Sequence, residues 1–342
     1  MDDLVKQQIA KANAAKKANV PWEFDEPWKQ PYYTYSNEQN NWIATTTSGQ
    51  RASSSDISTL ALYSWNIDFM LPHADSRMRA ALRHLQTSHI EKQNEQTASV
   101  IFLQECLLSD VRLIASDAWV QRTFAITDLS GENWQSGYYG TVTLVDRRLA
   151  IDSVFRVHFS ETRQERDGHF TDVKLGSQQK TLRLCNAHLE SLALDPPRRP
   201  LQMQLIAQYM HASGIDGAVV SGDFNAIQDF DRNLHIENKL KDAYLELGGS
   251  EDDAEGGHTW GQQAATVMRD RFGTTRMDKA YFCGELTCLS FERFGAGIEV
   301  EDEAERKELV ELGFDRPWVT DHLGVKTVFE ISESGSAHKS SL

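Results

Sequence analysis

The apolar residues of this chain fall into short runs that carry polar side chains at their ends. Six runs each have an Asn, Asp, Glu or His at or near one end: residues 60–64, 100–103, 182–185, 218–220, 277–282 and 323–329. Short apolar runs bounded by turn residues indicate buried β-strands. In open α/β sheets, ligands bind beyond the carboxyl ends of strands. The repetition therefore favours a functional site over independent turns.

The run 218–220 leads into Gly222-Asp223-Phe224-Asn225, around which we expect the site to be organised. Gly222 permits a turn or a close backbone approach. Taken alone, a strand followed by an Asx turn explains this segment at least as well as a catalytic site does. The five similar runs elsewhere in the chain tip the balance toward function.

Helical spacing separates several of these strand signals. Met78, Leu82 and Leu85 share one face of a helix predicted to continue to about residue 92, with Asp75 or Ser76 as its cap. Residues 106–115 predict a second helix. Residues 199–212 predict a third, with Pro200 in its first turn. Its apolar stripe is formed by Leu201, Leu205, Ile206 and Tyr209. Mixed strands and helices over this length predict an α/β fold with two packed sheets and outer helices.

The first 58 residues have a different composition. Residues 4–18 are Ala/Lys-rich and predict a weak, solvated helix, and residues 45–55 read as a Ser/Thr-rich linker. The aromatic segment 21–35 has two interpretations, a strap packed on the domain surface or a tail that binds a partner protein. Exposed aromatic rings are costly, which favours the strap. We therefore expect an N-terminal extension (1–58), a catalytic domain (59–332) and a polar tail (333–342).

Composition narrows the class of protein. The hydrophobic fraction of 40% is ordinary for a globular protein. No apolar run approaches the roughly 20 residues that span a bilayer, and the N-terminus lacks the pattern of a secretion signal. We expect no membrane association. The four cysteines are too few for a disulfide scaffold and are predicted to be free, mostly buried thiols.

The formal net charge of −15 disfavours non-specific binding to long duplexes. Acidic residues outnumber basic ones most strongly after residue 229, so a phosphate-binding face is expected in the middle of the chain. The arginines predicted to form it are Arg147, Arg148, Arg156, Arg163, Arg166, Arg198 and Arg199.

The six segments, in order and content, resemble the endonuclease/exonuclease/phosphatase superfamily over about residues 59–332. Trp65-Asn66-Ile67-Asp68 and His188-Leu189-Glu190-Ser191 are most similar to the 5′-tyrosyl-DNA phosphodiesterases, which remove topoisomerase II adducts from DNA 5′ ends. The resemblance implies a four-layer α/β sandwich of two mostly antiparallel sheets flanked by helices. Phe224 stands where that subfamily usually has Thr, and Ile227 where it has a basic residue. Both departures bear on substrate preference rather than on hydrolytic chemistry.

Glu105 is the first candidate for a metal ligand. A carboxylate at the end of an apolar strand is expensive to bury without a cation. Hard oxygen ligands point to Mg²⁺, with Mn²⁺ as a substitute. Asp68 is the second candidate ligand, although a cap on the following chain also explains it. The resemblance gives the metal role a modest advantage.

Asp223 is the candidate general base for an attacking water, because such a base must reach the water directly. Asn225 and Asn66 are neutral, and they can hydrogen-bond phosphate oxygens or the base without adding repulsion. These three residues form the predicted centre of the catalytic set.

Two histidines complete that set. His188 and His322 can each donate a hydrogen bond to charge developing on the phosphoryl group. Asp321 could approach the metal from the opposite side. The resemblance implies that Asp278, in Arg276-Met277-Asp278, orients His322 and favours its imidazolium form.

Three further residues are expected to contact substrate. Ser191 could donate its hydroxyl to a phosphate oxygen. The resemblance aligns Trp260 and Tyr139 with substrate-facing aromatic residues that could stack on a base or a tyrosyl ring. Ordinary packing at the rim explains each aromatic side chain equally well.

We therefore expect a monomeric Mg²⁺-dependent phosphodiesterase of the nucleus or cytoplasm that cleaves the 5′-phosphotyrosyl bond by in-line attack of water. Its expected partner is a DNA 5′ end bearing a tyrosyl adduct, preferably single-stranded. One alternative is another activity of the superfamily: abasic endonuclease, deadenylase, or sphingolipid or inositol phosphatase. The other is a non-catalytic scaffold that binds a partner through its aromatic N-terminal segment. The complete catalytic set argues against the scaffold.

Overall fold

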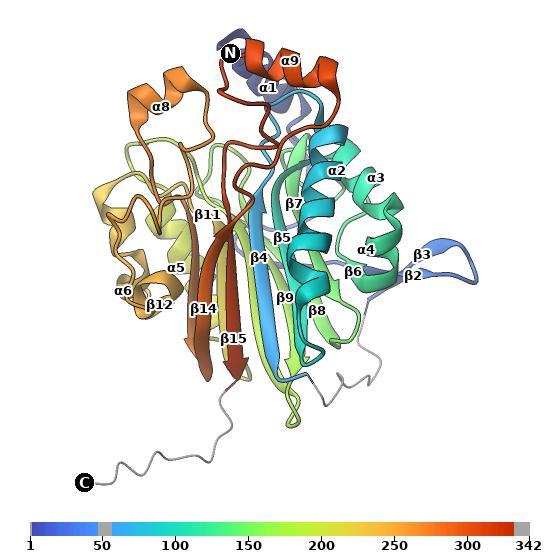
Figure 1. The fold of residues 1–342 in the computed structure, drawn as a ribbon. Helices are drawn as coiled ribbons and strands as arrows, with labels where there is room; N and C mark the ends of the chain where they lie inside the picture. Colours follow the sequence, from blue (N-terminus) through green and yellow to red (C-terminus); the bar gives the residue numbers. More distant parts are fainter. Residues whose placement is uncertain (1, 47–56, 332–342) are drawn as a thin grey trace.

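The computed structural model describes residues 2–46 and 57–331 and contains two sheets packed between helices (Figure 1). One sheet has seven strands, in the spatial order β1 (Pro27–Lys29), β8 (Ile151–His158), β9 (Asp167–Leu175), β10 (Lys180–His188), β11 (Gly217–Asp223), β13 (Asp278–Gly284) and β12 (Lys241–Asp242). The other has eight, in the order β14 (Leu286–Phe294), β15 (Gly324–Ile331), β4 (Thr59–Asn66), β5 (Thr97–Leu107), β7 (Tyr139–Asp146), β6 (Phe124–Ile126), β2 (Tyr32–Ser36) and β3 (Asn41–Thr45). The predicted four-layer sandwich is confirmed.

The two sheets are antiparallel except at their centres. Among the described strands, β4 and β5 form a parallel pair in one sheet, and β10 and β11 form a parallel pair in the other. Parallel neighbours end at the same edge of a sheet. Each sheet therefore brings two carboxyl ends together in its middle.

Alternation along the central strands divides the apolar residues between two layers. Leu60 and Leu62 of β4 pack in the core between the sheets, together with Leu184 of β10 and Val219 of β11. The alternate β4 residues pack instead against the helices α2 (Ala74–His84), α3 (Leu108–Ser116) and α4 (Ala118–Thr123). Helix α5 (Arg199–Met210) packs on the outer face of the seven-stranded sheet. Both faces of each central strand are thus buried.

The remaining helical segments lie around this sandwich. They are α1 (Asp2–Ala15), η1 (Leu85–His89), η2 (Ile90–Lys92), η3 (Asp229–Arg232), α6 (Leu234–Glu237), α7 (Ala243–Glu246), α8 (Thr266–Phe272) and α9 (Glu303–Glu311). The predicted weak N-terminal helix is present as α1. Helices α1, α8 and α9 all lie at the upper end of the molecule in Figure 1.

The predicted helices are present, but their boundaries differ from the predicted ones. Helix α2 follows His73, which has a left-handed backbone (φ 60°) and makes no side-chain cap, so the predicted cap at Asp75 or Ser76 is wrong. The predicted second helix starts at Leu108, because residues 106 and 107 still belong to β5. In α5, Pro200 does lie in the first turn, whereas Leu201 of the predicted stripe is exposed.

The aromatic N-terminal segment packs on its own domain, which confirms the strap. The Trp22 ring is 5% exposed and stacks on His158, with ring centroids 3.9 Å apart and planes 7° apart. The Trp28 indole N–H donates to Asn133 Oδ1 (3.1 Å). Strand β1 pairs with β8, and the β2–β3 hairpin joins the other sheet through β6. The domain division at residue 58 stays a prediction; the predicted linker (mostly 47–56) and polar tail lie outside the described residues.

Two compositional predictions can be compared with the described part of the chain. All four cysteines are free thiols, and three of them are buried. No described helix is both long enough and apolar enough to cross a membrane.

We predict that Trp22→Ala destabilises the protein by about 3–5 kcal/mol, because it removes a large buried ring and leaves a cavity against His158. The midpoint of urea unfolding measures this. Phe24 lies two residues away and is 42% exposed. Phe24→Ala should therefore shift the midpoint little, and equal losses from both changes would contradict a strap anchored at Trp22.

Candidate active site

The candidate site lies where the carboxyl ends of the two parallel strand pairs meet. In the register of β10 and β11, His188 is opposite Asp223, and in the register of β11 and β13, Asp223 is opposite Asp278. Asn66 ends β4 in the facing sheet, and His322 lies two residues before β15 begins at Gly324. Strand registry thus brings together polar side chains that are far apart in sequence.

Asp223 is the hub of this cluster. Its Oδ2 accepts a hydrogen bond from Asn66 Nδ2 (2.9 Å) and lies 3.4 Å from His188 Nε2 and 3.8 Å from His322 Nε2. Its Oδ1 accepts the backbone N–H of Asn225 (2.8 Å). The carboxylate is buried and held from both sheets, as required of a base that must keep one orientation.

A β-bulge aims Glu105 into the site. The pairing of β5 with β7 shifts between Leu103 and Cys106, and Glu105 has a left-handed backbone (φ 60°). Bulges bend a strand and redirect a side chain. Glu105 Oε2 accepts the backbone N–H of Phe69 (3.0 Å), and Oε1 lies 3.5 Å from His188 Nε2. Glu105 lies within β5 rather than at its end, because the strand continues to Leu107. The position at the strand end that the sequence predicts is therefore wrong.

Asp68 sits in a turn that a buried arginine holds in place. Its backbone N–H donates to Asn66 Oδ1 (2.9 Å), and its own Oδ1 accepts the N–H of Met70 (2.8 Å). The Arg77 guanidinium donates to the carbonyls of Asp68 (2.8 Å) and Val319 (2.8 Å). Arg77 thereby ties the Asp68 loop to the loop that carries Asp321. Sequence reasoning missed this arginine, whose partners are all backbone oxygens.

The carboxylates of this region suit a divalent cation. Burial, together with the neighbouring Asp321 and Glu105 carboxylates, raises the pKa of Asp68 to about 8. Burial likewise raises the pKa of Glu105. Buried like charges are costly unless a cation compensates them. Glu105 and Asp68 are thus suited to hold a hard cation such as Mg²⁺, and donor atoms of Glu105, His188 and Asp223 also lie within 4.8 Å of one another.

His322 carries a positive charge beside the hub. Its Nδ1 lies 2.8 Å from Asp278 Oδ2, which fixes the ring. Burial by itself would lower the pKa of His322, but the Asp278, Asp223 and Asp321 carboxylates outweigh it and hold the pKa well above its ordinary value. Nε2 is therefore protonated and directed toward Asp223. This arrangement has the geometry that the sequence predicts for Asp278.

His188, in contrast, is uncharged. Arg166 lies 2.6 Å from its Nδ1. A guanidinium has donors only, so Nδ1 must accept and Nε2 must carry the proton. Burial lowers the pKa of His188 well below its ordinary value, and the charges of Arg166 and His322 add to this. The ring is thus a neutral donor whose Nε2–H points toward Glu105 and Asp223.

Arg166 is the one member of the predicted arginine face that contacts this cluster. Two other arginines of this set form buried ion pairs that stabilise the fold. Arg156 pairs with Asp128 and Asp167 with no exposure, and Arg199 pairs with Asp231 in a buried site. Arg156 and Arg199 therefore do not belong to the phosphate-binding face expected in the middle of the chain, and that face stays a prediction.

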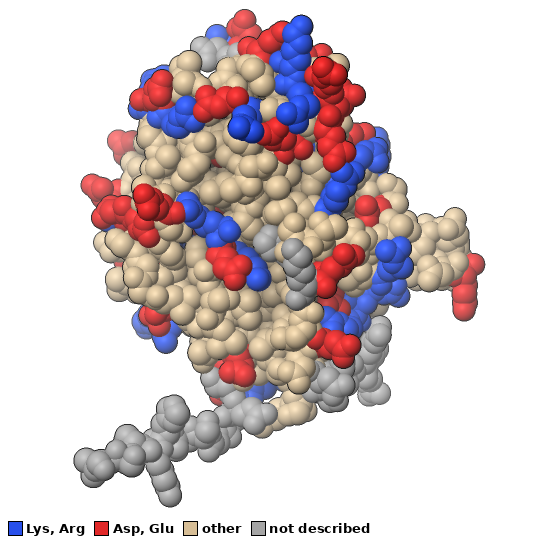
Figure 2. Space-filling model, viewed as in Figure 1, with Lys and Arg blue, Asp and Glu red and all other residues tan. Residues whose placement is uncertain are grey.

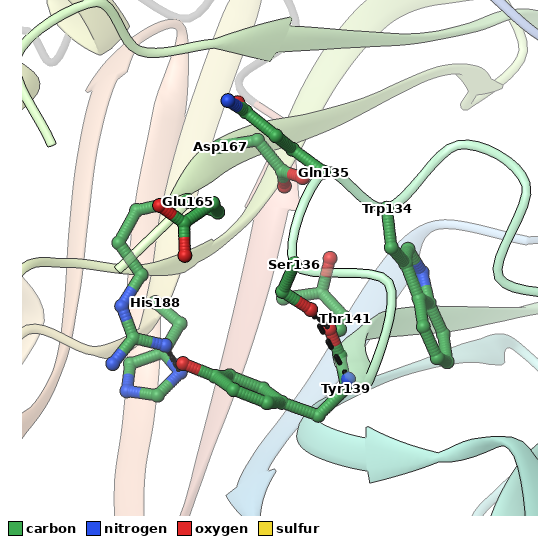
Figure 3. A pocket seen from close by; sticks show the side chains of 10 residues that line it. Trp134, Gln135, Ser136, Tyr139, Thr141, Glu165, Asp167 and His188 are labelled. Atoms are coloured by element: carbon green, nitrogen blue, oxygen red, sulfur yellow. Dashed lines mark hydrogen bonds between the residues drawn. The ribbon is translucent and has the colours of Figure 1, made fainter. Parts of the chain in front are cut away.

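The three predicted substrate residues lie around the cluster. Ser191 Oγ hydrogen-bonds Gln164 Oε1 (2.8 Å). The Tyr139 ring stacks on Phe69, with centroids 4.1 Å apart, and lines a recess of about 20 Å³ with His188 (Figure 3). Trp260 donates its indole N–H to Asp321 Oδ2 (2.7 Å) and lines a second cavity beside Asp68 and Asp321. Their contact with substrate stays a prediction.

The two departures from the subfamily pattern have different surroundings. Phe224 is fully buried and packs its ring edge-on against Tyr281, with centroids 5.0 Å apart. It changes the packing beneath the site and lines neither recess described above. Ile227 is 41% exposed, so an apolar side chain stands in solvent where the subfamily has a basic one.

Comparisons with known proteins agree with this architecture. The model of the Endonuclease/Exonuclease/phosphatase family matches residues 63–322. A truncated TDP2 from Caenorhabditis elegans is similar with a TM-score of 0.60 at 22% identity, covering 80% of this chain and 97% of that one. TDP2 from D. rerio, complexed with single strand DNA product, has a TM-score of 0.58 at 17% identity, covering 80% and 99%. A mannosyl-6-phosphatase from Bacteroides thetaiotaomicron has a TM-score of 0.56 at 14% identity, covering 78% and 98%.

No curated protein matches the sequence. At the identities of these solved structures, the likeness establishes the fold alone.

We predict that Glu105→Gln abolishes metal binding at the site but does not lower the stability of the metal-free protein. The change removes an anionic ligand but keeps an oxygen that can accept the Phe69 N–H. Calorimetric titration should detect no Mn²⁺ binding at the site. The free energy of unfolding without metal should hold or rise, since one buried like charge is gone.

Mn²⁺ should stabilise the unchanged protein by mass action and should not stabilise the variant. The exposed Glu132 offers a matched control, because Glu132→Gln should leave both properties unchanged. Full Mn²⁺ affinity in Glu105→Gln would remove Glu105 from the metal site.

Proposed function

Because the chain belongs to the Endonuclease/Exonuclease/phosphatase family, we propose that it is a Mg²⁺-dependent phosphodiesterase that hydrolyses the 5′-phosphotyrosyl bond at DNA ends, in DNA repair. The observation that carries this proposal is the hub at Asp223, with Asn66 at 2.9 Å and the Nε2 atoms of two histidines within 3.8 Å. A buried base surrounded by hydrogen-bond donors is suited to direct a water at a phosphorus atom.

Glu105 and Asp68 would hold the Mg²⁺, for which Mn²⁺ could substitute. When bound, the ion would neutralise phosphate charge and polarise a phosphoryl oxygen. Without a cation, the carboxylates of the site would repel a phosphodiester. This repulsion supports a requirement for the metal ion. Asp321, whose Oδ2 accepts a hydrogen bond from the Trp260 indole N–H, would approach the ion from the opposite side.

Asp223 would orient the attacking water and take its proton, while Asn66 and the backbone of Asn225 keep the carboxylate in place. His322 would donate from its charged imidazolium, and His188 from a neutral Nε2–H. Two fixed donors stabilise charge that develops on the phosphoryl oxygens without reorganisation during the reaction. Arg166 and Asp278 would act as positioning residues for these rings.

The tyrosyl leaving group suits this set. Tyrosine has a pKa of about 10, so its phenolate can leave without a strong general acid. Trp260 and Tyr139 would contribute rings beside the site, and Ser191 a hydroxyl. Only one strand of a DNA end needs to reach such a site. Stacking of its bases on the aromatic rings would contribute about 1–3 kcal/mol of binding free energy per base, without sequence preference.

Surface charge supports a single strand over a long duplex. On the face drawn in Figure 2, acidic and basic side chains are interspersed rather than segregated. Long duplexes are held mainly by arrays of phosphate contacts. The monomeric state stays a prediction. Placement in the nucleus or cytoplasm stays a prediction that follows from the repair role.

We predict that His322→Ala lowers kcat more than Asp278→Asn does. His322 would touch the phosphoryl group, whereas Asp278 acts through it. Loss of Asp223 as base, in Asp223→Asn, should lower kcat by about 10²–10⁴-fold. Steady-state kinetics with folded variants measures all three. A larger kcat loss from Asp278→Asn than from His322→Ala would contradict this division of roles.

We predict that, with Mg²⁺, a single strand bearing a 5′-tyrosyl group is turned over faster than every rival substrate. The rivals are an abasic duplex, a poly(A) strand, a sphingolipid phosphoester, an inositol polyphosphate and a sugar 6-phosphate. Parallel kcat/KM measurements decide between them. Preference for a rival would reject the tyrosyl substrate and keep the family chemistry, whereas no turnover of any substrate would favour the non-catalytic scaffold.

A further inference from the structure

Helix α1 bridges the two sides of the active-site end. On one side, Val5 and Lys6 line the same cavity as Asp68, Asp321 and Trp260. Further along the helix, Gln8 Oε1 accepts a hydrogen bond from the hydroxyl of Tyr138 (2.7 Å). Figure 1 shows the N-terminus and α1 at the upper end, where β4 and β11 end.

The far side of the bridge continues past the C-terminus of α1. Lys16 forms an ion pair with Glu165, which lines the recess shared by Tyr139 and His188 (Figure 3). The segment 5–16 therefore lines one recess beside the catalytic cluster, through Val5 and Lys6, and contacts a wall residue of the other, through Lys16.

The cavity under α1 is small for an extended substrate. It measures about 250 Å³, and its walls include Met70, Trp260, Met268 and Phe314. Pockets for drug-sized ligands measure about 300–1,000 Å³. A single nucleotide or an aryl group can approach this space, whereas a strand of several nucleotides needs the volume that α1 fills.

The attachment of α1 is weak along its whole length. None of its side chains from Asp3 to Ala15 is buried, and Ile9 is 47% exposed. Its half-buried residues (Leu4, Val5, Gln8, Ala12 and Ala15) form one thin face. Isolated helices of this length are marginal in water, so α1 needs this face to stay ordered. Few buried contacts mean a low free energy of local opening.

The chain that follows α1 is firmly anchored. Lys17 Nζ donates to the carbonyls of Gly131 (2.6 Å) and Glu132 (2.7 Å), and its backbone N–H donates to Gln135 O (3.0 Å). Trp22 is buried against His158. A loosely held helix thus leads directly into a fixed strap, which is the arrangement of a lid with a hinge at its base.

We propose that α1 is a lid that governs which substrates reach the site. Closed, it admits small phosphoesters. A DNA strand, or the peptide on the other side of a tyrosyl bond, displaces it by rotation about the segment before Lys17. This inference rests on the proposed phosphodiesterase function and adds a specificity element to it.

Two substrates and one pair of matched variants test the lid in the full-length chain. Val5→Asp places an unpaired carboxylate in the cavity whose walls include Met70, Trp260 and Phe314, and the cost of burying that charge should favour the displaced position of α1. Ile9→Asp makes the same change on the exposed face and serves as the control. The substrates are a 5′-tyrosyl single strand and a small aryl ester of thymidine 5′-monophosphate.

Val5→Asp should raise kcat/KM for the strand at least several-fold and leave the small ester unchanged, while Ile9→Asp changes neither. A cleavable bismaleimide cross-link between cysteines introduced by Gln8→Cys and Tyr138→Cys should abolish strand turnover and spare the small ester until it is cleaved. A fixed wall of the groove would behave differently. Val5→Asp would then lower strand turnover, and the cross-link would have no selective effect, which would overturn the lid.

Hydrogen exchange gives a readout that does not need turnover. With Mg²⁺ and a 5′-phosphorylated single strand, the amides of residues 4–15 should exchange faster, while those of residues 22–35 stay unchanged. Unchanged exchange in α1 would overturn the lid. Absence of hydrolysis of both substrates by the unchanged protein would instead overturn the proposed function, and the exchange result would still decide the lid.

Discussion

Burying several carboxylates at one end of a sandwich is the constraint on which the rest of this structure depends. Glu105, Asp68, Asp223 and Asp278 all lie within the protein. Buried charges of one sign raise the free energy of the fold unless donors or cations surround them. Each carboxylate has its own hydrogen-bond donor: Asn66 for Asp223, His322 for Asp278, the Phe69 amide for Glu105 and the Met70 amide for Asp68.

The same constraint explains why the two histidines differ. His322 faces three carboxylates and keeps its proton, while His188 is pinned by Arg166 and stays neutral. One charged and one neutral imidazole beside Asp223 provide two hydrogen-bond donors with only one added positive charge. Asp68 and Glu105 keep raised pKa values despite these partners. That residual imbalance is the physical argument for a divalent cation.

Much of this architecture can be predicted from the sequence, because it follows from apolar runs and their polar ends. The six strands, the outer helices, the sandwich and the family resemblance are confirmed by the structure and the comparisons. Several candidate site residues also lie close together, since His188 and Asp223 end neighbouring strands in register and Asn66 ends a strand of the facing sheet. Local patterns carry this information whenever a side chain stands at a strand end.

The rest depends on long-range geometry that no local pattern contains. The bulge at Glu105 is set by pairing with β7, and Arg77 acts through backbone carbonyls that the sequence does not mark. The sequence also could not separate Arg166, which contacts His188, from Arg156 and Arg199, which pair with internal carboxylates across the fold. The position of α1 over the site likewise depends on Val5, Gln8 and Lys16 meeting distant surfaces.

We propose that this carboxylate cluster holds a divalent cation through Glu105 and Asp68. Anomalous diffraction from crystals soaked in Mn²⁺ tests it most directly. The account predicts a single strong peak within coordination distance of oxygens from both residues. A peak at Asp223 and His322 instead, or no peak near the cluster at saturating Mn²⁺, would contradict it.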